Sequence, residues 1–185
     1  MQKYDSDLLI SQEIVDKLTE IVGGPQFIST DVETRSNYSR DMTEQVAPRL
    51  TDVVVLPDNV EQVQEIVILA NENGIPVIPY AAGANIGGLT LPTERGGITM
   101  DFKRMREVIE INRENKYIVV EPGFTFGDLK RLLDTEIPEF RYSFPFSPPY
   151  TSVGCNALLH GLGSLSVMYG SADNFINGLE VVLPT

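Results

Sequence analysis

The sequence predicts an α+β fold that contains a βαβ unit and mixed sheets, and two observations indicate it. The β-branched run TDVVVLP (51–57) is followed by a helix-like segment (59–74) and then by a second apolar run, IPVIP (75–79). A strand, a helix and a strand in this order are typical of a right-handed, parallel βαβ unit. Strand-like runs separated by turn residues then predict a meander or hairpins at GGITMDF (96–102), EVIEIN (107–112) and YIVVEPG (117–123).

An amphipathic helix is expected within DLLISQEIVDKLTEIVGG (7–24). Gly23 and Gly24 provide a helix stop, and apolar residues recur at helical spacing at Leu9, Ile14, Leu18, Ile21 and Val22. The following stretch, 28–48, is polar and irregular, which favours a surface crossing. Residues 1–47 are therefore interpreted as an N-terminal helix and a surface crossing.

Two further helices are predicted from capping boxes, in which the N-cap residue and the third helical residue bond each other's backbone. Asp58 with Glu61 opens the helix that Gly74 ends, and Thr125 with Asp128 opens a helix in TFGDLKRLLDTE (125–136). The apolar residues expected to be buried are Val60, Val63, Ile66, Val67 and Ala70 in the first, and Phe126, Leu129, Leu132 and Leu133 in the second.

Composition narrows the classes of function. The net charge of −12, from 26 acidic and 14 basic residues, would repel a polyanion, so nucleic acid is not expected as a partner. No apolar run approaches the roughly 20 residues of a membrane span, and the first residues do not form a signal peptide, so a soluble, cytoplasmic protein is expected. The strand-like end GLEVVLP (178–184) has no partner after it, which suggests a fragment or a split subunit.

A small-residue loop, PYAAGANIGG (79–88), directly follows the second predicted strand. Without bulky side chains, its backbone N–H groups can approach phosphate oxygens, and Gly83, Gly87 and Gly88 can adopt positive φ. It is neither a Walker A motif nor a GxGxxG opening a helix. From the loop alone, a phosphate cradle and a tight turn between strands both stay open, and the turn is favoured.

Three longer segments carry further motifs, and their order along the chain matters: 53–88, 96–129 and 148–184. Together they resemble the FAD-binding (PCMH-type) domain of the vanillyl-alcohol oxidase flavoprotein family. Within the family they are most similar to FAD-linked D-lactate and glycolate dehydrogenases and to cresol-dehydrogenase-like enzymes. The resemblance implies a two-subdomain FAD-binding fold, with the first subdomain at 48–122 and the start of a second, truncated one at 123–185.

The resemblance also implies which residues hold FAD. The loop matches the family segment whose backbone amides bind the pyrophosphate: Ala81, Ala82, Gly83, Ala84, Asn85, Ile86, Gly87 and Gly88. Pro122 and Gly123 match a turn beside the cofactor. Further matched positions that wrap or follow the cofactor are Pro148, Pro149, Ser152, Val153, Gly154, Cys155, Asn156, His160, Gly163, Tyr169, Gly170 and, near the adenine, Val181.

Departures from the family pattern change some of these expectations. Tyr80 stands where many relatives have arginine, so a charge contact to the cofactor is expected to be missing. Ala84 stands where covalently flavinylated members carry histidine, so non-covalent FAD is expected. Cys155 and His160 replace residues that are often glycine and asparagine, which leaves either altered redox tuning or simple drift open.

Other chemistry-bearing residues have ordinary structural interpretations beside the functional ones. His160, the only histidine, is a structural residue or a flavin contact, and Cys155, the only cysteine, is expected to be a buried thiol that acts as a small hydrophobe. The acidic pairs favour solvated surface over a metal site: Asp5/Asp7, Asp31/Glu33 and Glu136/Glu139. An aromatic pocket and simple packing both stay open for Tyr142, Phe144, Phe146 and Tyr150.

The family resemblance implies a function for the whole protein of which this would be the FAD-binding part. That protein would oxidise a 2-hydroxy acid, such as D-lactate or glycolate, to the 2-oxo acid and pass electrons to an acceptor. Oxidation of a phenolic or benzylic alcohol is the alternative within the enzyme class. The alternative from another class is a non-catalytic cofactor-binding or assembly subunit that needs a partner. A partner subunit or a missing C-terminal domain is expected to complete the protein. Which residues are catalytic stays unknown, since the family resemblance implies that relatives usually take their catalytic groups from the substrate domain.

Overall fold

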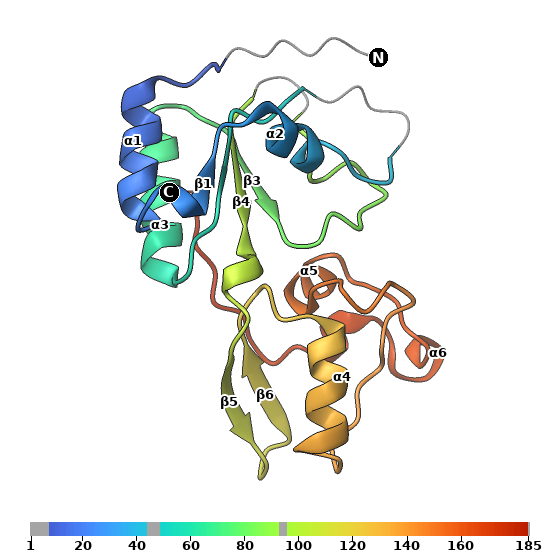
Figure 1. The fold of residues 1–185 in the computed structure, drawn as a ribbon. Coiled ribbons are helices and arrows are strands. Elements are labelled where there is room, and N and C mark those ends of the chain that lie inside the picture. The colour runs from blue at the N-terminus through green and yellow to red at the C-terminus, as the bar shows by residue number, and fades with distance from the viewer. Residues whose placement is uncertain (1–7, 44–48, 93–95, 185) are drawn as a thin grey trace. The chain divides into compact units, whose positions relative to one another are not determined.

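The computed structural model describes residues 8–43, 49–92 and 96–184 (Figure 1). The chain divides into two compact units, Met1–Arg104 with Val181–Thr185, and Met105–Glu180. These units have other bounds than the expected cofactor-binding subdomains at 48–122 and 123–185, because residues 105–122 group with the second unit. The expected subdomain boundaries stay predictions.

A four-stranded sheet with the order β1-β2-β4-β3 forms the centre of the first unit. The short β1 (Ile28–Ser29) runs antiparallel to β2 (Val53–Val55), whereas β2 and β3 (Val77–Tyr80) both run parallel to β4 (Ile98–Asp101). The predicted strand–helix–strand unit is therefore parallel, with β4 inserted between its two strands.

The position of β4 corrects the sequence analysis, which expected 96–102 in a meander or hairpin. All four residues of β4 are buried, as are the three of β2. Strands covered on both faces are typical of parallel sheets, in which such apolar runs occupy the central positions. The burial of Ile98 and Met100 thus explains why this strand joins the parallel sheet rather than its neighbours in sequence.

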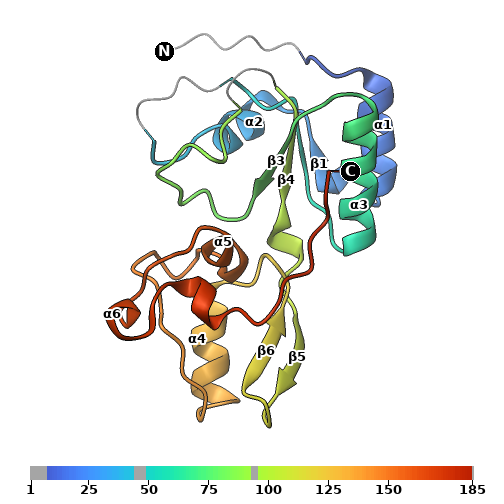
Figure 2. The same cartoon turned by 180° about the vertical axis from the view of Figure 1, so that it is seen from behind.

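Two helices of the first unit lie side by side, α1 (Gln12–Ile21) and α3 (Val60–Glu72), as Figure 2 shows from behind. The expected N-terminal helix is shorter than 7–24, because Ser11 caps it and its side chain accepts from the N–H of Ile14. Its buried residues are Ile14, Val15 and Leu18.

The predicted start of α3 is wrong by one residue. Its N-cap is Asn59, whose side chain accepts from the N–H of Gln62 at 2.9 Å, and Gln62 Oε1 accepts from the N–H of Asp58 at 2.9 Å. This is not a complete capping box, because Gln62 reaches back to the N–H of Asp58, one residue before the N-cap, rather than to that of Asn59. The buried residues of α3 are Val63, Ile66, Leu69 and Ala70, while Val60 and Val67 are half-buried.

The described part of 28–48 is more regular than the expected surface crossing, since it contains β1 and α2 (Val32–Tyr38). Asp31 caps α2 by accepting from the N–H of Thr34 at 2.9 Å. Arg35 is buried, and its Nε donates to the carbonyl of Thr51 at 2.6 Å. This long-range contact stabilises a helix that is too short to form by itself.

The second unit contains a hairpin and a well-capped helix. The antiparallel pair β5 (Val108–Asn112) and β6 (Tyr117–Val120) confirms the expected hairpin. The capping box of Thr125 and Asp128 opens α4 (Phe126–Thr135), also as predicted. The buried core of this unit consists of Phe124, Phe126, Leu129, Leu132 and Ile137.

The remaining chain forms short helices and irregular segments: α5 (Val153–Leu158), α6 (Ser166–Tyr169) and a 3-10 turn at Ala172–Phe175. The expected strand at 178–184 is wrong, because these residues form no strand and pair with none of the described strands. A strand needs a hydrogen-bonded neighbour, which apolar residues alone do not provide.

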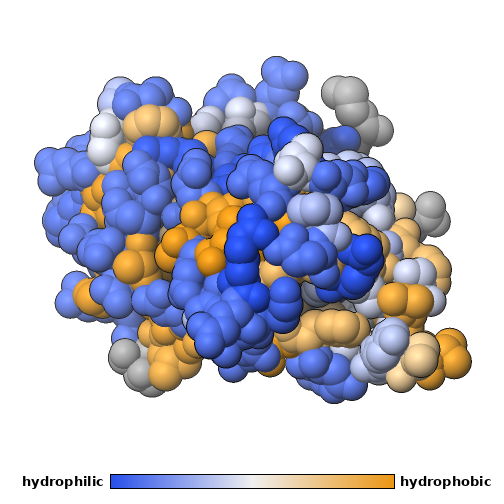
Figure 3. Space-filling view, turned by 90° about the horizontal axis from the view of Figure 1, so that it is seen from below, coloured by the Kyte–Doolittle hydropathy of each residue, from blue (hydrophilic) through white to orange (hydrophobic). Residues whose placement is uncertain are grey.

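Hydrophilic residues cover most of the face drawn in Figure 3, and apolar residues lie in small groups between them. This distribution agrees with the excess of acidic residues in the composition. None of the helices in the described ranges is long and apolar enough to cross a membrane.

Candidate functional site

The glycine-containing loop 81–88 begins where β3 ends, at Tyr80, which pairs with Asp101 at the end of β4. The loop thus lies at the carboxyl edge of the parallel strands, where α/β sheets usually bind ligands. Gly83 and Gly88 have φ values of 63° and 72°. Both positions favour glycine because other residues adopt this conformation at a cost.

Several backbone N–H groups of this loop donate no hydrogen bond to the described protein: those of Ala81, Ala82, Gly83, Ala84, Ile86 and Gly88. Buried backbone donors are nearly always paired, so such a set belongs at a surface that water or a ligand reaches. Successive N–H groups without partners form the kind of concavity that binds anions. The residues present fit a phosphate group.

Asn85 anchors this loop at two points. Its side-chain oxygen accepts from the N–H of Gly87 at 2.7 Å, and its carbonyl accepts from the N–H of Met42 at 3.0 Å. The turn closes further on, where the N–H of Leu91 donates to the carbonyl of Gly88. The loop therefore has defined ends although most of its own amides are unpaired.

Beside the loop lies a polar cluster that the sequence analysis did not anticipate. The hydroxyl of Tyr38 donates to Oδ2 of Asp101 at 2.5 Å and accepts from Nζ of Lys103 at 2.9 Å. Burial raises the pKa of the Tyr38 hydroxyl, and the hydrogen bond to Asp101 raises it further. Recognising Asp31 and Thr34 as a helix cap would have revealed α2, and with it the placement of Tyr38.

In the second unit, two predicted cofactor segments lie side by side. The N–H of Gly127 donates to the carbonyl of Pro149 at 2.7 Å, and the N–H of Val153 donates to the carbonyl of Phe124 at 2.8 Å. A Cβ built on Gly154 would be 3.2 Å from the carbonyl oxygen of Pro122. The turn at 122–123 and the stretch 148–155 are thus joined, although 25 to 33 residues separate them in sequence.

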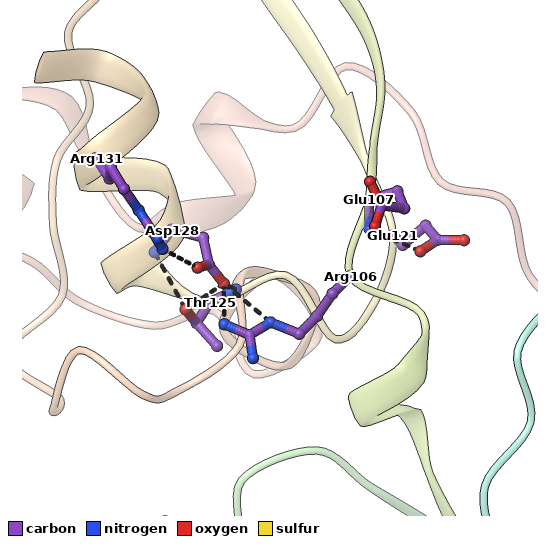
Figure 4. Close-up of polar contacts among 6 residues, drawn as sticks. All are labelled: Arg106, Glu107, Glu121, Thr125, Asp128 and Arg131. Atoms are coloured by element: carbon purple, nitrogen blue, oxygen red, sulfur yellow. Dashed lines mark hydrogen bonds and ion pairs between the residues drawn. The ribbon is translucent and has the colours of Figure 1, made fainter. Parts of the chain in front are cut away.

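Asp128 organises the start of α4 (Figure 4). Its carboxylate accepts from the hydroxyl of Thr125 at 2.6 Å, from Nη2 of Arg106 at 2.6 Å, and from Arg131. Desolvation raises the pKa of Asp128, but the hydrogen bonds from Thr125 and Arg106 outweigh it, so that the pKa lies below its ordinary value.

Contacts around the hairpin place the predicted turn at Pro122 and Gly123. The N–H of Gly123 donates to the carbonyl of Met105 at 2.8 Å. Glu121 Oε2 accepts from the N–H of Glu107 at 2.7 Å. Figure 4 shows Glu107 and Glu121 next to each other at the start of the hairpin. The hydrogen bonds to Met105 and within the hairpin therefore hold one side of the turn, and Pro122 lies against Gly154 of α5 on the other.

Ser152 caps α5 by accepting from the N–H of Cys155 at 2.9 Å. The expectation of a buried Cys155 is wrong, because its side chain is exposed on this short helix, although desolvation by nearby chain raises the pKa of the thiol.

His160 follows the end of α5 in the left-handed region, with φ 50°. The N–H of Gly161 donates to the carbonyl of Asn156, which is the pattern of a Schellman helix end, and His160 Nδ1 lies 3.4 Å from Asp173 Oδ1. The histidine side chain is otherwise exposed. It thus ends a helix at a position that most often carries glycine.

Some other predicted positions have structural explanations of their own. Gly163 is buried, and a Cβ there would be 2.5 Å from the carbonyl oxygen of Phe144. Gly170 ends α6 with φ 84°, Tyr169 packs against Phe175, and Val181 is exposed and groups with the first unit.

The aromatic and acidic residues are divided between core and surface. Tyr142 and Phe144 pack against Phe126, whereas Phe146 and Tyr150 are exposed. Asp31 caps α2 and Glu139 pairs with Arg113, while Asp5 and Asp7 lie outside the described residues. In the parts of the chain that the structure describes, no group of three or more His, Cys, Asp or Glu side chains could hold a metal ion.

Comparison with known proteins identifies a family and several relatives. Residues 51–185 match the family described as FAD binding domain. The chain is 31% identical over 175 residues to glycolate oxidase subunit GlcD of Bacillus subtilis, covering 95% of this chain and 36% of that protein. It is 30% identical over 177 residues to the mitochondrial D-lactate dehydrogenase [cytochrome] of Arabidopsis thaliana, covering 95% and 30%.

A third relative is named for a different substrate. The chain is 34% identical over 141 residues to the flavoprotein subunit of 4-cresol dehydrogenase [hydroxylating] of Pseudomonas putida, covering 74% of this chain and 26% of that protein. The chain thus spans about a third of the length of the curated relatives it matches.

Solved structures have the same fold. An alkyldihydroxyacetonephosphate synthase aligns with a TM-score of 0.78 at 23% identity, over 91% of this chain and 32% of that one. A 4-ethylphenol oxidase from Gulosibacter chungangensis aligns with a TM-score of 0.70 at 28% identity, over 85% and 31%. The family match covers nearly three quarters of the sequence and includes the glycine-containing loop, so this chain belongs to the FAD binding domain family.

Proposed function

We propose that loop 81–88 binds the diphosphate of FAD through its backbone N–H groups. The observation that carries this proposal is the set of unpaired N–H groups in a loop that the FAD binding domain family match includes. Gly83 and Gly88 give the backbone its curvature, and the absence of large side chains at 81–84 lets phosphate oxygens approach.

In our proposal, residues of the joined segments of the second unit also contact the cofactor. Pro122, Gly123, Ser152 and Gly154 form a closely packed backbone surface, with the carbonyl of Pro122 against Gly154. Cys155, Asn156 and His160 follow on α5 and at its end. These residues orient the cofactor in our proposal, and Ala84 offers no nucleophile to its ring, so FAD is held without a covalent bond.

When bound, FAD supplies a two-electron acceptor for a hydride from a substrate carbon. We infer that the whole protein oxidises a 2-hydroxy acid to the 2-oxo acid, because glycolate oxidase and D-lactate dehydrogenase align over 95% of this chain. The identity of 34% to 4-cresol dehydrogenase supports a phenolic substrate as the second candidate. A partner subunit is a further expectation, since two of these relatives are named as subunits.

FAD binding is tested by titrating the purified protein with FAD and following the quenching of flavin fluorescence. We expect saturable binding that ADP competes with and adenosine does not, because adenosine lacks the diphosphate. Gly87→Val, at a glycine of this loop that does not have positive φ, should weaken FAD binding at least about tenfold, a loss of about 1.4 kcal/mol, with a smaller effect on unfolding. Gly178→Ala is the matched control, since a Cβ there meets nothing within 4 Å.

Failure of both this chain and a longer chain containing it to take up FAD would contradict the proposal. Substrate class is tested separately with the FAD-loaded protein, by following reduction of an electron-accepting dye in the presence of glycolate, D-lactate or 4-cresol. Dye reduction with 4-cresol alone would replace the hydroxy-acid proposal by the phenolic one.

A further inference from the structure

We propose that Tyr80 is a positioning residue that presets the phosphate loop by packing over Gly83. This inference rests on the proposed function of loop 81–88 and extends it to a side chain outside the loop. Tyr80 is the last residue of β3, so its backbone belongs to the sheet while its side chain reaches the loop.

The close packing of Tyr80 over Gly83 is evident from the atoms that a side chain at position 83 would contact. A Cβ built there would overlap the Tyr80 hydroxyl and lie 2.9 Å from Cζ of the same ring. Real Cβ atoms are not found so close to other atoms, so Gly83 and the Tyr80 ring occupy adjoining space only because residue 83 is glycine. Its φ of 63° is a second, independent requirement for glycine.

The ring of Tyr80 cannot easily move aside, because it packs against the ring of Tyr38 with centroids 4.7 Å apart and planes tilted by 59°. Such aromatic pairs have preferred geometries and stabilise each other beyond simple burial. Tyr38 in turn is held at its hydroxyl by Asp101 and Lys103.

Asp101 completes the connection to the sheet. It ends β4, its side chain is only 3% exposed, and its Oδ1 accepts from the N–H of Lys103 at 2.9 Å. A series of packed and hydrogen-bonded groups thus runs from the central strand through Tyr38 and Tyr80 to Gly83.

This arrangement would lower the cost of ligand binding. A loop that is already in its binding conformation loses less conformational freedom when a ligand binds, so more of the interaction appears as affinity. Tyr80 would therefore affect the affinity for diphosphate compounds without having to touch them.

The first test compares Tyr80→Leu and Tyr80→Phe with the unchanged protein. Tyr80→Leu should weaken both FAD and ADP binding about tenfold, whereas Tyr80→Phe, which keeps the ring, should retain affinity within about threefold. Tyr117→Phe is the matched control. It removes a hydroxyl that also makes a hydrogen bond, to Glu110 at 2.9 Å, but Tyr117 belongs to β6 and not to the phosphate loop. Unchanged FAD and ADP affinity in Tyr80→Leu would overturn the inference.

The second test is a double-mutant cycle of Gly83→Ala and Tyr80→Leu, with ADP affinity and urea unfolding both measured. Gly83→Ala should weaken ADP binding strongly in the unchanged protein and less in the Tyr80→Leu background, where the new Cβ has room. If Tyr80 has only a structural role, the two substitutions should be coupled in their effects on unfolding but not in their effects on ADP affinity. That result would contradict the positioning role, and so would additive effects in both measurements.

The two proposals can fail separately. If the unchanged protein binds neither FAD nor ADP, the proposed function is contradicted, and the positioning role is contradicted with it. Normal binding in the unchanged protein together with normal binding in Tyr80→Leu contradicts only the positioning role.

Discussion

Arg106 and Asp128 form an ion pair in which both Nε and Nη2 of the guanidinium donate to one carboxylate oxygen, at 3.1 and 2.6 Å. Arg106 precedes β5 and Asp128 lies in the first turn of α4, so the pair connects the hairpin to the helix. Charge-assisted hydrogen bonds of this kind are stronger than neutral ones, and the side chain of Asp128 is only 13% exposed.

Replacing Asp128 should make the protein less stable and less sensitive to acid. Asp128→Asn keeps the shape but loses the charge, and we expect a cost of about 1–2 kcal/mol at pH 7. The pKa of Asp128 in the folded state lies below its ordinary value of 3.8, so its stabilisation is present above that pH and is lost as the pH falls.

Urea unfolding between pH 7 and pH 3 checks this prediction. The stability difference between Asp128→Asn and the unchanged protein should shrink towards the acid end. Asp134→Asn is the control, because Asp134 pairs with Lys130 on an exposed surface, with 61% of its side chain accessible. A constant difference across this range would show that the Asp128 charge does not contribute.

Tyr38→Phe should destabilise the first unit by about 1–3 kcal/mol, because Asp101 then loses a buried hydrogen-bond donor. Tyr117→Phe should change stability by less than about 0.5 kcal/mol, because the hydroxyl of this half-buried residue makes an exposed hydrogen bond to Glu110. Thermal or urea unfolding of both variants measures the difference. Equal effects of the two substitutions would mean that the Tyr38–Asp101 bond adds nothing to stability.

Gly163→Ala should destabilise the protein by about 1–3 kcal/mol, because its Cβ would overlap the carbonyl groups of Ser143 and Phe144. Gly178→Ala, where a Cβ meets nothing, provides the control in the same unfolding measurement. If Gly163→Ala lowered FAD affinity but left stability unchanged, Gly163 would be a cofactor contact rather than a packing glycine.

His160→Gly should raise stability by up to about 1 kcal/mol, because glycine adopts positive φ without the cost that histidine incurs. We expect FAD affinity to fall at the same time, since His160 belongs to the proposed cofactor site. Calorimetry and FAD titration of the same preparation separate the two effects. Higher stability with unchanged FAD affinity would assign His160 a purely structural role.

Local patterns predicted several elements well. Thr125 and Asp128 form the expected capping box, and the runs around Val108 and Val120 form the expected hairpin. These features depend on hydrogen bonds between residues close in sequence, so the residue types alone indicate them. The start of α3 was predicted one residue too early, because Asp58 and Asn59 are both favourable N-cap residues and only the backbone conformation selects between them.

Long-range contacts decided what local patterns could not. α2 depends on the burial of Arg35 against Thr51, and β4 joins the parallel sheet because its residues are covered on both faces. The exposure of Cys155 likewise follows from which face of the short helix α5 meets the rest of its unit.

The sequence by itself determined the family, the FAD-binding character and the loop at 81–88, because ordered motifs of glycine, proline and apolar residues are visible without coordinates. Only the tertiary structure decided that β4 lies between β2 and β3, that 178–184 forms no strand, and that Tyr38 and Tyr80 pack beside the loop. The physical reason is that strand pairing and side-chain packing join residues distant in the chain, and their energies depend on neighbours that no local pattern specifies.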